Sequence, residues 1–260
     1  MQKTFVATLA ILVASQVLLA VDSVTANDLP AYEPTEAYED RVVNGWSIKL
    51  NRRLIRDEPK LCDDVMRELD HQLYLVTRVV PKPALEKVKT ITIWVELFEK
   101  NTPCAAYHPD VKWLKEHDIN PDKRRCVELA NARNFVNWTH GQPWMILHEL
   151  AHGYHHQFLE NGFRNAEVRD AFENGTGDDR YGQVRHIRGG MRDHYAATNP
   201  MEYFAETSEA FFGVNDYFPF VRAELQQYDP HGLATIKKMW EIGLATKADR
   251  PNDETPAPRD

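Results

Sequence analysis

Two histidines four residues apart, inside an apolar segment, restrict most strongly how this chain can fold. Residues 148–152 read His-Glu-Leu-Ala-His, and the surrounding residues 142–158 have the apolar flanks of a buried helix. Residues four apart lie about one turn apart on the same helix face, so the imidazoles of His148 and His152 can reach one metal ion. The five-residue pattern alone is only moderately specific, and the helical context strengthens it.

The residue types in this motif favour zinc chemistry. Two imidazoles and one carboxylate hold zinc while leaving the fourth tetrahedral position to water. Glu149 follows the first histidine directly, where its carboxylate can take a proton from that water. The motif therefore predicts one Zn²⁺ per chain bound by His148 and His152, with Glu149 as the general base. The neighbouring His155 and His156 are predicted to be ordinary helix residues.

A second helix offers the missing carboxylate ligand. Residues 199–212 begin with Asn-Pro, which is suited to a helix N-terminus, and carry Glu202, Glu206 and Glu209 at positions i, i+4 and i+7. The aromatic and alanine residues between them make this helix too apolar to be mostly exposed. Its carboxylates therefore need a metal ion or a histidine N–H as partner, and the spacing leaves all three as candidate ligands.

The region before this helix resembles a known family. Tyr195, then Thr-Asn at 198–199 and Glu-Tyr-Phe-Ala-Glu at 202–206, is similar to the third-ligand segment of the anthrax lethal factor protease domain and its relatives. Those proteins are gluzincins, with a thermolysin-like His-His-Glu zinc site. The resemblance covers the motif helix and residues 193–212. It implies a zincin fold, with Glu202 as the zinc ligand, Glu206 as the residue holding a ligand histidine, and Tyr195 as the donor to the oxyanion.

The limits of the resemblance restrict what it implies. Residues 142–156 and 199–220 also resemble a group of secreted bacterial metallopeptidases, but the N-terminal third matches neither group. Because substrate preference depends on the individual site, the resemblance does not imply that this chain shares the substrate preference of anthrax lethal factor. If Tyr195 is not the oxyanion donor, His194 and His186 are the next candidates.

The remaining patterns predict an α+β domain. Asn-Gly at 44–45 between two short apolar runs predicts a β-hairpin, and the apolar spacing of residues 59–80 predicts a helix. Residues 91–98 are typical of a core strand, and residues 126–130 of a short strand. The latter is either the edge strand that pairs with an extended substrate or an ordinary buried strand. The expected fold is a zincin-like domain with a small mixed sheet, an active-site helix and a C-terminal helical part.

Both ends of the chain differ from the predicted domain. Residues 1–26 combine Lys3, an interrupted apolar run and small residues before Asn27, which indicates a signal peptide. A membrane anchor is the alternative, although the run is shorter than the roughly 20 apolar residues that span a bilayer. We expect an exported protein, extracellular or periplasmic, that leaves the membrane after signal cleavage. Its domain is predicted over residues 27–248, followed by a disordered polar tail over 249–260.

Charge and cysteine content narrow the function further. A formal net charge of −8 argues against nucleic acid as a partner, because phosphate binding needs a basic surface. Export permits a disulfide among Cys62, Cys104 and Cys126; Cys104–Cys126 is the preferred pair, and three free thiols are the alternative.

The predicted function is that of a zinc metalloendopeptidase acting on a peptide or protein substrate. Its reaction is hydrolysis of a peptide bond by a zinc-activated water. Two alternatives stay open: a non-catalytic zinc-binding secreted protein, and a zinc amidase acting on cell-wall peptides.

Overall fold

The computed structural model describes residues 32–242 as an α+β fold. The strands are β1 Tyr38–Val43, β2 Trp46–Asn51, β3 Ile93–Val95, β4 Ala105–Tyr107, β5 Val127–Leu129, β6 Gln183–Arg185 and β7 Met191–Asp193. The helices are α1 Arg52–Asp57, α2 Pro59–Val79, α3 Lys82–Val88, α4 Val111–Glu116, α5 Ala132–Trp138, α6 Met145–Phe158, α7 Ala166–Thr176, α8 Pro200–Phe212, α9 Arg222–Tyr228 and α10 Pro230–Met239. The predicted signal peptide and polar tail lie outside the described residues. Within residues 32–242, no helix has the length and hydropathy to cross a membrane.

The larger sheet is mixed and has the order β1-β2-β3-β5-β4. Its β1–β2 hairpin turns at Asn44 and Gly45, whose φ angles of 49° and 92° are those of a left-handed turn, as the Asn-Gly pair predicts. Strands β2, β3 and β5 run parallel, whereas β4 is antiparallel to β5. The small β6–β7 hairpin stands apart from this sheet.

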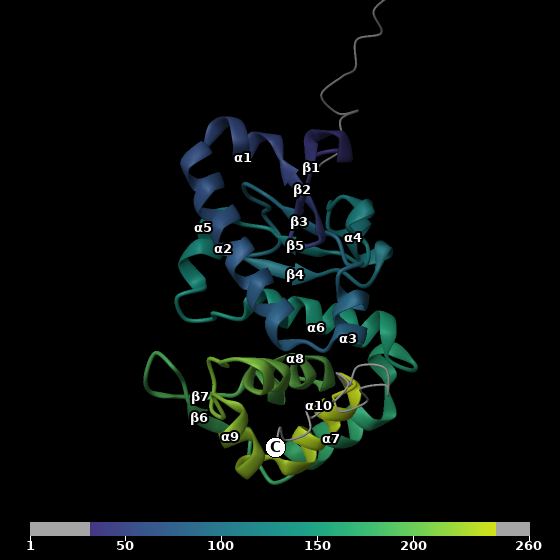
Figure 1. Cartoon of the computed structure of the whole chain (residues 1–260), viewed down its shortest axis with the longest axis vertical. Coiled ribbons are helices and arrows are strands. Elements are labelled where there is room, and N and C mark those ends of the chain that lie inside the picture. The colour runs from purple at the N-terminus through teal and green to yellow at the C-terminus, as the bar shows by residue number, and fades with distance from the viewer. Residues whose placement is uncertain (1–31, 243–260) are drawn as a thin grey trace, which may run out of the picture.

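Figure 1 shows the sheet in the upper part of the molecule and a helical part below it, with α6 and α8 side by side between them. Helix α6 packs against β4 on the sheet side and against α8 on the other. Apolar residues of α2, including Val65, Leu69 and Leu73, share one core with the inward faces of β3 and β5. This packing fixes α6 between the sheet and α8. Polar side chains on its sheet side therefore meet different partners from those on its α8 side.

The opposite face of the sheet buries charged groups together with the aromatic rings of Tyr38 and Trp94. Lys123 is 2% exposed and bonds the carboxylates of Glu96 and Glu128, while His108 Nε2 lies 2.6 Å from the second carboxylate. A buried ammonium between two carboxylates is compensated locally, which makes burial tolerable. This network fixes the loop before β5 onto the strands; its members are too far apart in sequence to be recognised from spacing.

Of the two alternatives for residues 126–130, the ordinary buried strand is confirmed and the edge strand is wrong. Strand β5 forms there, but it is fully buried and pairs with β3 on one side and β4 on the other. The terminal strand of the sheet beside α6 is β4, for which the sequence analysis predicted no strand. Three residues with two alanines give too short a pattern to predict a strand, so only the pairing with β5 reveals it.

The preferred disulfide between Cys104 and Cys126 does not form, and all three cysteines are free thiols. The strand register explains this. Ala130 N–H donates to the carbonyl of Cys104, and His108 N–H donates to that of Cys126, so the two cysteines lie at opposite ends of the β4–β5 pair. Four residues of strand separate them by roughly 13 Å. A disulfide requires Cα atoms within about 7 Å.

Candidate metal centre

Helix α6 carries the histidine motif in the orientation that the spacing predicts. Leu147, Leu150 and Ala151 are buried in the core, while His148 and His152 turn to the opposite side, toward α8. The two imidazole rings lie 4.7 Å apart between centroids. The apolar face therefore anchors the helix, and the polar face lines an adjacent cleft.

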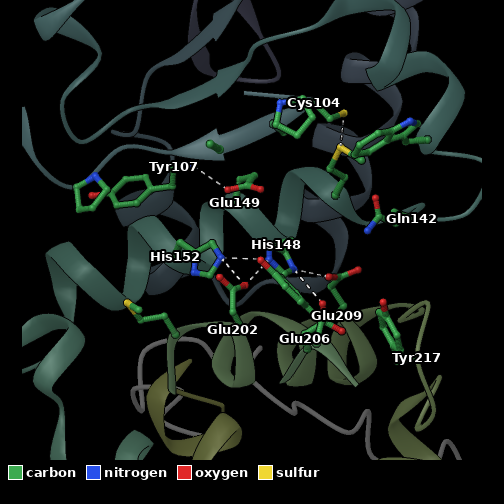
Figure 2. Close-up of a pocket in the computed structure, with 18 of the residues that line it drawn as sticks. Cys104, Tyr107, Gln142, His148, Glu149, His152, Glu202, Glu206, Glu209 and Tyr217 are labelled. Atoms are coloured by element: carbon green, nitrogen blue, oxygen red, sulfur yellow. Dashed lines mark hydrogen bonds and ion pairs between the residues drawn. The ribbon is translucent and has the colours of Figure 1, made fainter. Parts of the chain in front are cut away.

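Helix α8 brings its carboxylates to the same place. Its N-terminus is capped by Asn199, whose side-chain oxygen accepts from the N–H groups of Met201 and Glu202. Pro200 occupies the first turn, where its missing N–H costs nothing. The cap starts the helix at a position that points Glu202, Glu206 and Glu209 toward α6, as Figure 2 shows.

His148, His152 and Glu202 form a compact donor triangle. His148 Nε2 lies 3.1 Å from His152 Nε2, and both nitrogens lie 3.2 Å from Glu202 Oε2 (Figure 2). Ligands bound tetrahedrally at about 2.0–2.2 Å are roughly 3.3–3.5 Å apart. The triangle is thus close to the size that a tetrahedral metal ion requires, and the three residues form a group that could hold such an ion.

The electrostatics of the triangle favour a bound cation. Burial by itself would lower the pKa of His148, but the carboxylates of Glu202 and Glu209 raise it well above its usual value. Burial opposes ionisation of Glu202 as well, yet hydrogen bonds from both imidazoles lower its pKa. The carboxylates of the centre therefore favour positive charge at this position, as a metal-binding site requires.

The residue that orients His148 is Glu209 and not Glu206. Glu209 Oε1 lies 2.7 Å from His148 Nδ1, the ring nitrogen opposite the triangle, whereas Glu206 Oε1 is 3.7 Å away. The role that the family resemblance implies for Glu206 thus falls to a residue one helical turn later. Both carboxylates are almost fully buried, which raises their pKa values. Together with His148 they form a second possible metal-binding group, although it uses the nitrogen already bonded to Glu209.

Glu149 turns to the sheet side of α6. Its Oε2 accepts the backbone N–H of Tyr107 in β4 at 2.8 Å, and only 9% of the residue is exposed (Figure 2). Its carboxylate lines the same cleft as the donor triangle. The general base expected from the sequence is therefore held at the wall formed by the terminal strand.

A cleft of about 500 Å³ opens over the triangle. Its upper wall is β4 with the loop before it, and its floor is formed by α6 and α8. Tyr195 lies in a short 3-10 turn, Tyr195–Ala197, after β7; its ring stands 6.5 Å from that of His148, and 47% of the residue is exposed. Because Tyr195 is partly exposed in the cleft, its side chain is accessible to a bound ligand.

The alternative donors do not share that position. His186 and His194 are buried and do not line the cleft. His194 accepts the N–H of Ala196 through Nδ1, and burial lowers its pKa to about 3. Tyr217, which the sequence analysis did not single out, also lines the cleft. Tyr217 lies five residues after the end of α8, and neither a motif nor a spacing in the sequence identifies it as a cleft residue.

Comparison with protein-family models, curated proteins and solved structures finds no match for this chain.

Proposed function

We propose that this protein is a zinc-dependent metalloendopeptidase with a zincin-like, gluzincin-type site. The observation that carries the proposal is the donor triangle of His148, His152 and Glu202, with Glu149 beside it in one cleft. Two imidazoles and one carboxylate are the ligand set of catalytic zinc, and they leave one position for water. Oxygen-rich sites would instead be expected for magnesium or calcium.

The reaction assigns a task to each residue around the triangle. Zinc bound there would lower the pKa of a coordinated water to about 7 and polarise a carbonyl. Glu149 takes a proton from the attacking water and returns it to the leaving amine. Tyr195 donates its hydroxyl to the oxyanion that develops on the substrate carbonyl. Glu209 accepts the Nδ1 proton of His148 and so fixes the orientation of that ring.

The terminal strand suits an extended peptide substrate. Register with β5 directs the backbone groups of Cys104, Ala106 and His108 toward that strand. The N–H and C=O of Ala105 consequently face the other way, at the edge that borders the cleft. An extended chain can add to such an edge by backbone hydrogen bonds, which favours peptide over other amide substrates.

Incubation of the purified, zinc-loaded protein with a mixed peptide library tests the proposal. We expect new amino termini at internal peptide bonds, detected by mass spectrometry, and their loss on chelation and return with zinc. A zinc-loaded protein that leaves every peptide intact would contradict it and favour the non-catalytic zinc-binding alternative. Cleavage confined to cell-wall peptides would favour the amidase alternative.

The third ligand is tested by the zinc affinities of single glutamine variants. Glu202→Gln removes a direct ligand, so its loss of affinity should exceed the roughly 10–100-fold that loss of an outer partner costs. Glu209→Gln should fall within that range, because it affects only the bond to His148 Nδ1. Glu206→Gln should have the smallest effect. Competition with a chelator of known affinity gives the order, and a larger loss in Glu206→Gln than in Glu202→Gln would transfer the ligand role.

The oxyanion donor is tested by Tyr195→Phe, which keeps the ring and removes the hydroxyl. Loss of one such donor should lower kcat by roughly 10²–10³-fold with little change in KM. Zinc content and Tm should stay near the wild-type values, because the residue is half exposed. Tyr217→Phe is the matched variant in the same cleft. Unchanged kcat in the first variant together with a large loss in the second would move the role to Tyr217.

A further inference from the structure

One side of α6 holds the terminal strand at Tyr107. Glu149, Gly153 and His156 stand at positions i, i+4 and i+7, so they share one helix face, and all three contact Tyr107 of β4. The backbone N–H of Tyr107 donates to Glu149, and its hydroxyl lies 2.8 Å from His156 Nδ1. This residue is therefore attached to the helix at both ends.

Gly153 supplies the space between these two contacts. A Cβ atom at this glycine would lie 3.1 Å from Tyr107 Cε2 and 2.5 Å from Ile91 Cδ1. A larger residue here would displace the Ile91 side chain and push the tyrosine ring away from the helix by a few tenths of an ångström. The need arises from close approach, because the glycine is in the interior of a regular helix.

The imidazole of His156 is itself held in place. Its ring stacks on Phe163 with centroids 4.8 Å apart. Burial, with Arg125 and Arg124 nearby, lowers the pKa of His156, which favours the neutral imidazole and so a ring nitrogen that can accept from the tyrosine hydroxyl. The hydroxyl of Tyr107 thus has a fixed acceptor at the cleft wall.

The backbone N–H at position 107 has no role within the sheet. Odd-numbered positions of β4 face away from β5, so this N–H would have no partner in the sheet if Glu149 did not accept it. The carboxylate in turn has a donor whose place depends on the side chain of the same residue.

We propose that Tyr107 is the positioning residue for Glu149: its side chain, latched to α6 over Gly153 by His156, fixes the backbone N–H that holds the carboxylate in the cleft. The catalytic part of this inference rests on the proposed function, whereas the latch itself does not. Because a carboxylate displaced by about 1 Å can cost on the order of 10²-fold in rate, such a latch has kinetic consequences.

Two measurements on Tyr107→Phe test the latch and its catalytic role separately. Amide hydrogen exchange at position 107, followed by NMR on the zinc-loaded chain, should become about tenfold faster when the latch opens. Under the proposed function, kcat should fall by roughly 10–100-fold with KM and zinc content unchanged. Tyr154→Phe is the matched control, because its hydroxyl leaves the same helix to bond the carbonyl of Met239. Tyr154→Phe should change neither the amide exchange rate at position 107 nor kcat.

Substitution of His156, at the other end of the latch, gives an independent test. His156→Gln keeps an acceptor for the hydroxyl and should retain most of the protection, whereas His156→Leu should behave like Tyr107→Phe. Unchanged exchange in both Tyr107→Phe and His156→Leu would overturn the latch. Faster exchange with unchanged kcat would overturn its catalytic role. If the wild-type chain cleaves no peptide, the proposed function fails, while the exchange data still decide whether the latch exists.

Discussion

Glu149→Gln should reduce peptide hydrolysis by roughly 10²–10⁴-fold, the usual contribution of a general base. The amide cannot accept the proton of the attacking water. Its carbonyl oxygen can still accept the N–H of Tyr107, so the side chain should keep its place. Zinc content should not change, because Glu149 is not one of the residues of the donor triangle.

The measurement is kcat/KM on a peptide identified from the library, with zinc quantified in the same preparation. Glu173→Gln serves as control, because it removes one carboxylate from an exposed pair with Arg169 on α7. Its activity should match that of the wild type. Activity of Glu149→Gln within about tenfold of wild type would place the base elsewhere or indicate a contaminating peptidase.

Replacing both His148 and His152 with alanine should eliminate zinc binding and hydrolysis together. Glu202 would then be the only remaining member of the triangle, and one carboxylate does not form a zinc site. Elemental analysis should find about one zinc per wild-type chain and essentially none in the double variant.

A second double variant, His71→Ala with His231→Ala, is the matched control. Both residues are exposed, and the second pairs with Asp170 at the surface. It removes two imidazoles without touching the cleft and should retain zinc. Less than half an equivalent in the reconstituted wild type, or zinc retained when His148 and His152 are absent, would contradict the proposed site.

The two outcomes also separate the alternative functions. A zinc-binding protein without turnover would lose zinc in the double variant, but it would show no activity for Glu149→Gln to remove. An enzyme acting on another amide bond would respond to both changes in the same way as a peptidase. Only the bond cleaved in the library distinguishes that case, because the base and the ligands serve both reactions.

Local features of the chain were predictable from the sequence. The α6 and α8 segments, the turn at Asn44 and Gly45, and the common face of Glu202, Glu206 and Glu209 follow from helical periodicity, capping and turn chemistry. These depend on neighbours within a few residues. For the same reason His148 and His152 could be expected on one helix face before any tertiary contact was known.

Partners between elements were decided only by tertiary structure. Glu202 meets His148 Nε2 and Glu209 meets Nδ1 because the crossing of α8 on α6 puts two carboxylates that are about two turns apart on either side of one ring. The spacing of Glu202, Glu206 and Glu209 along α8 does not indicate which of the three carboxylates is the ligand. The terminal strand is β4 and not β5 because pairing is set by the order of strands across the sheet, and its N–H at Tyr107 reaches Glu149 for the same reason. Residues far apart in sequence come into contact through the packing of whole elements, and no local pattern encodes that packing.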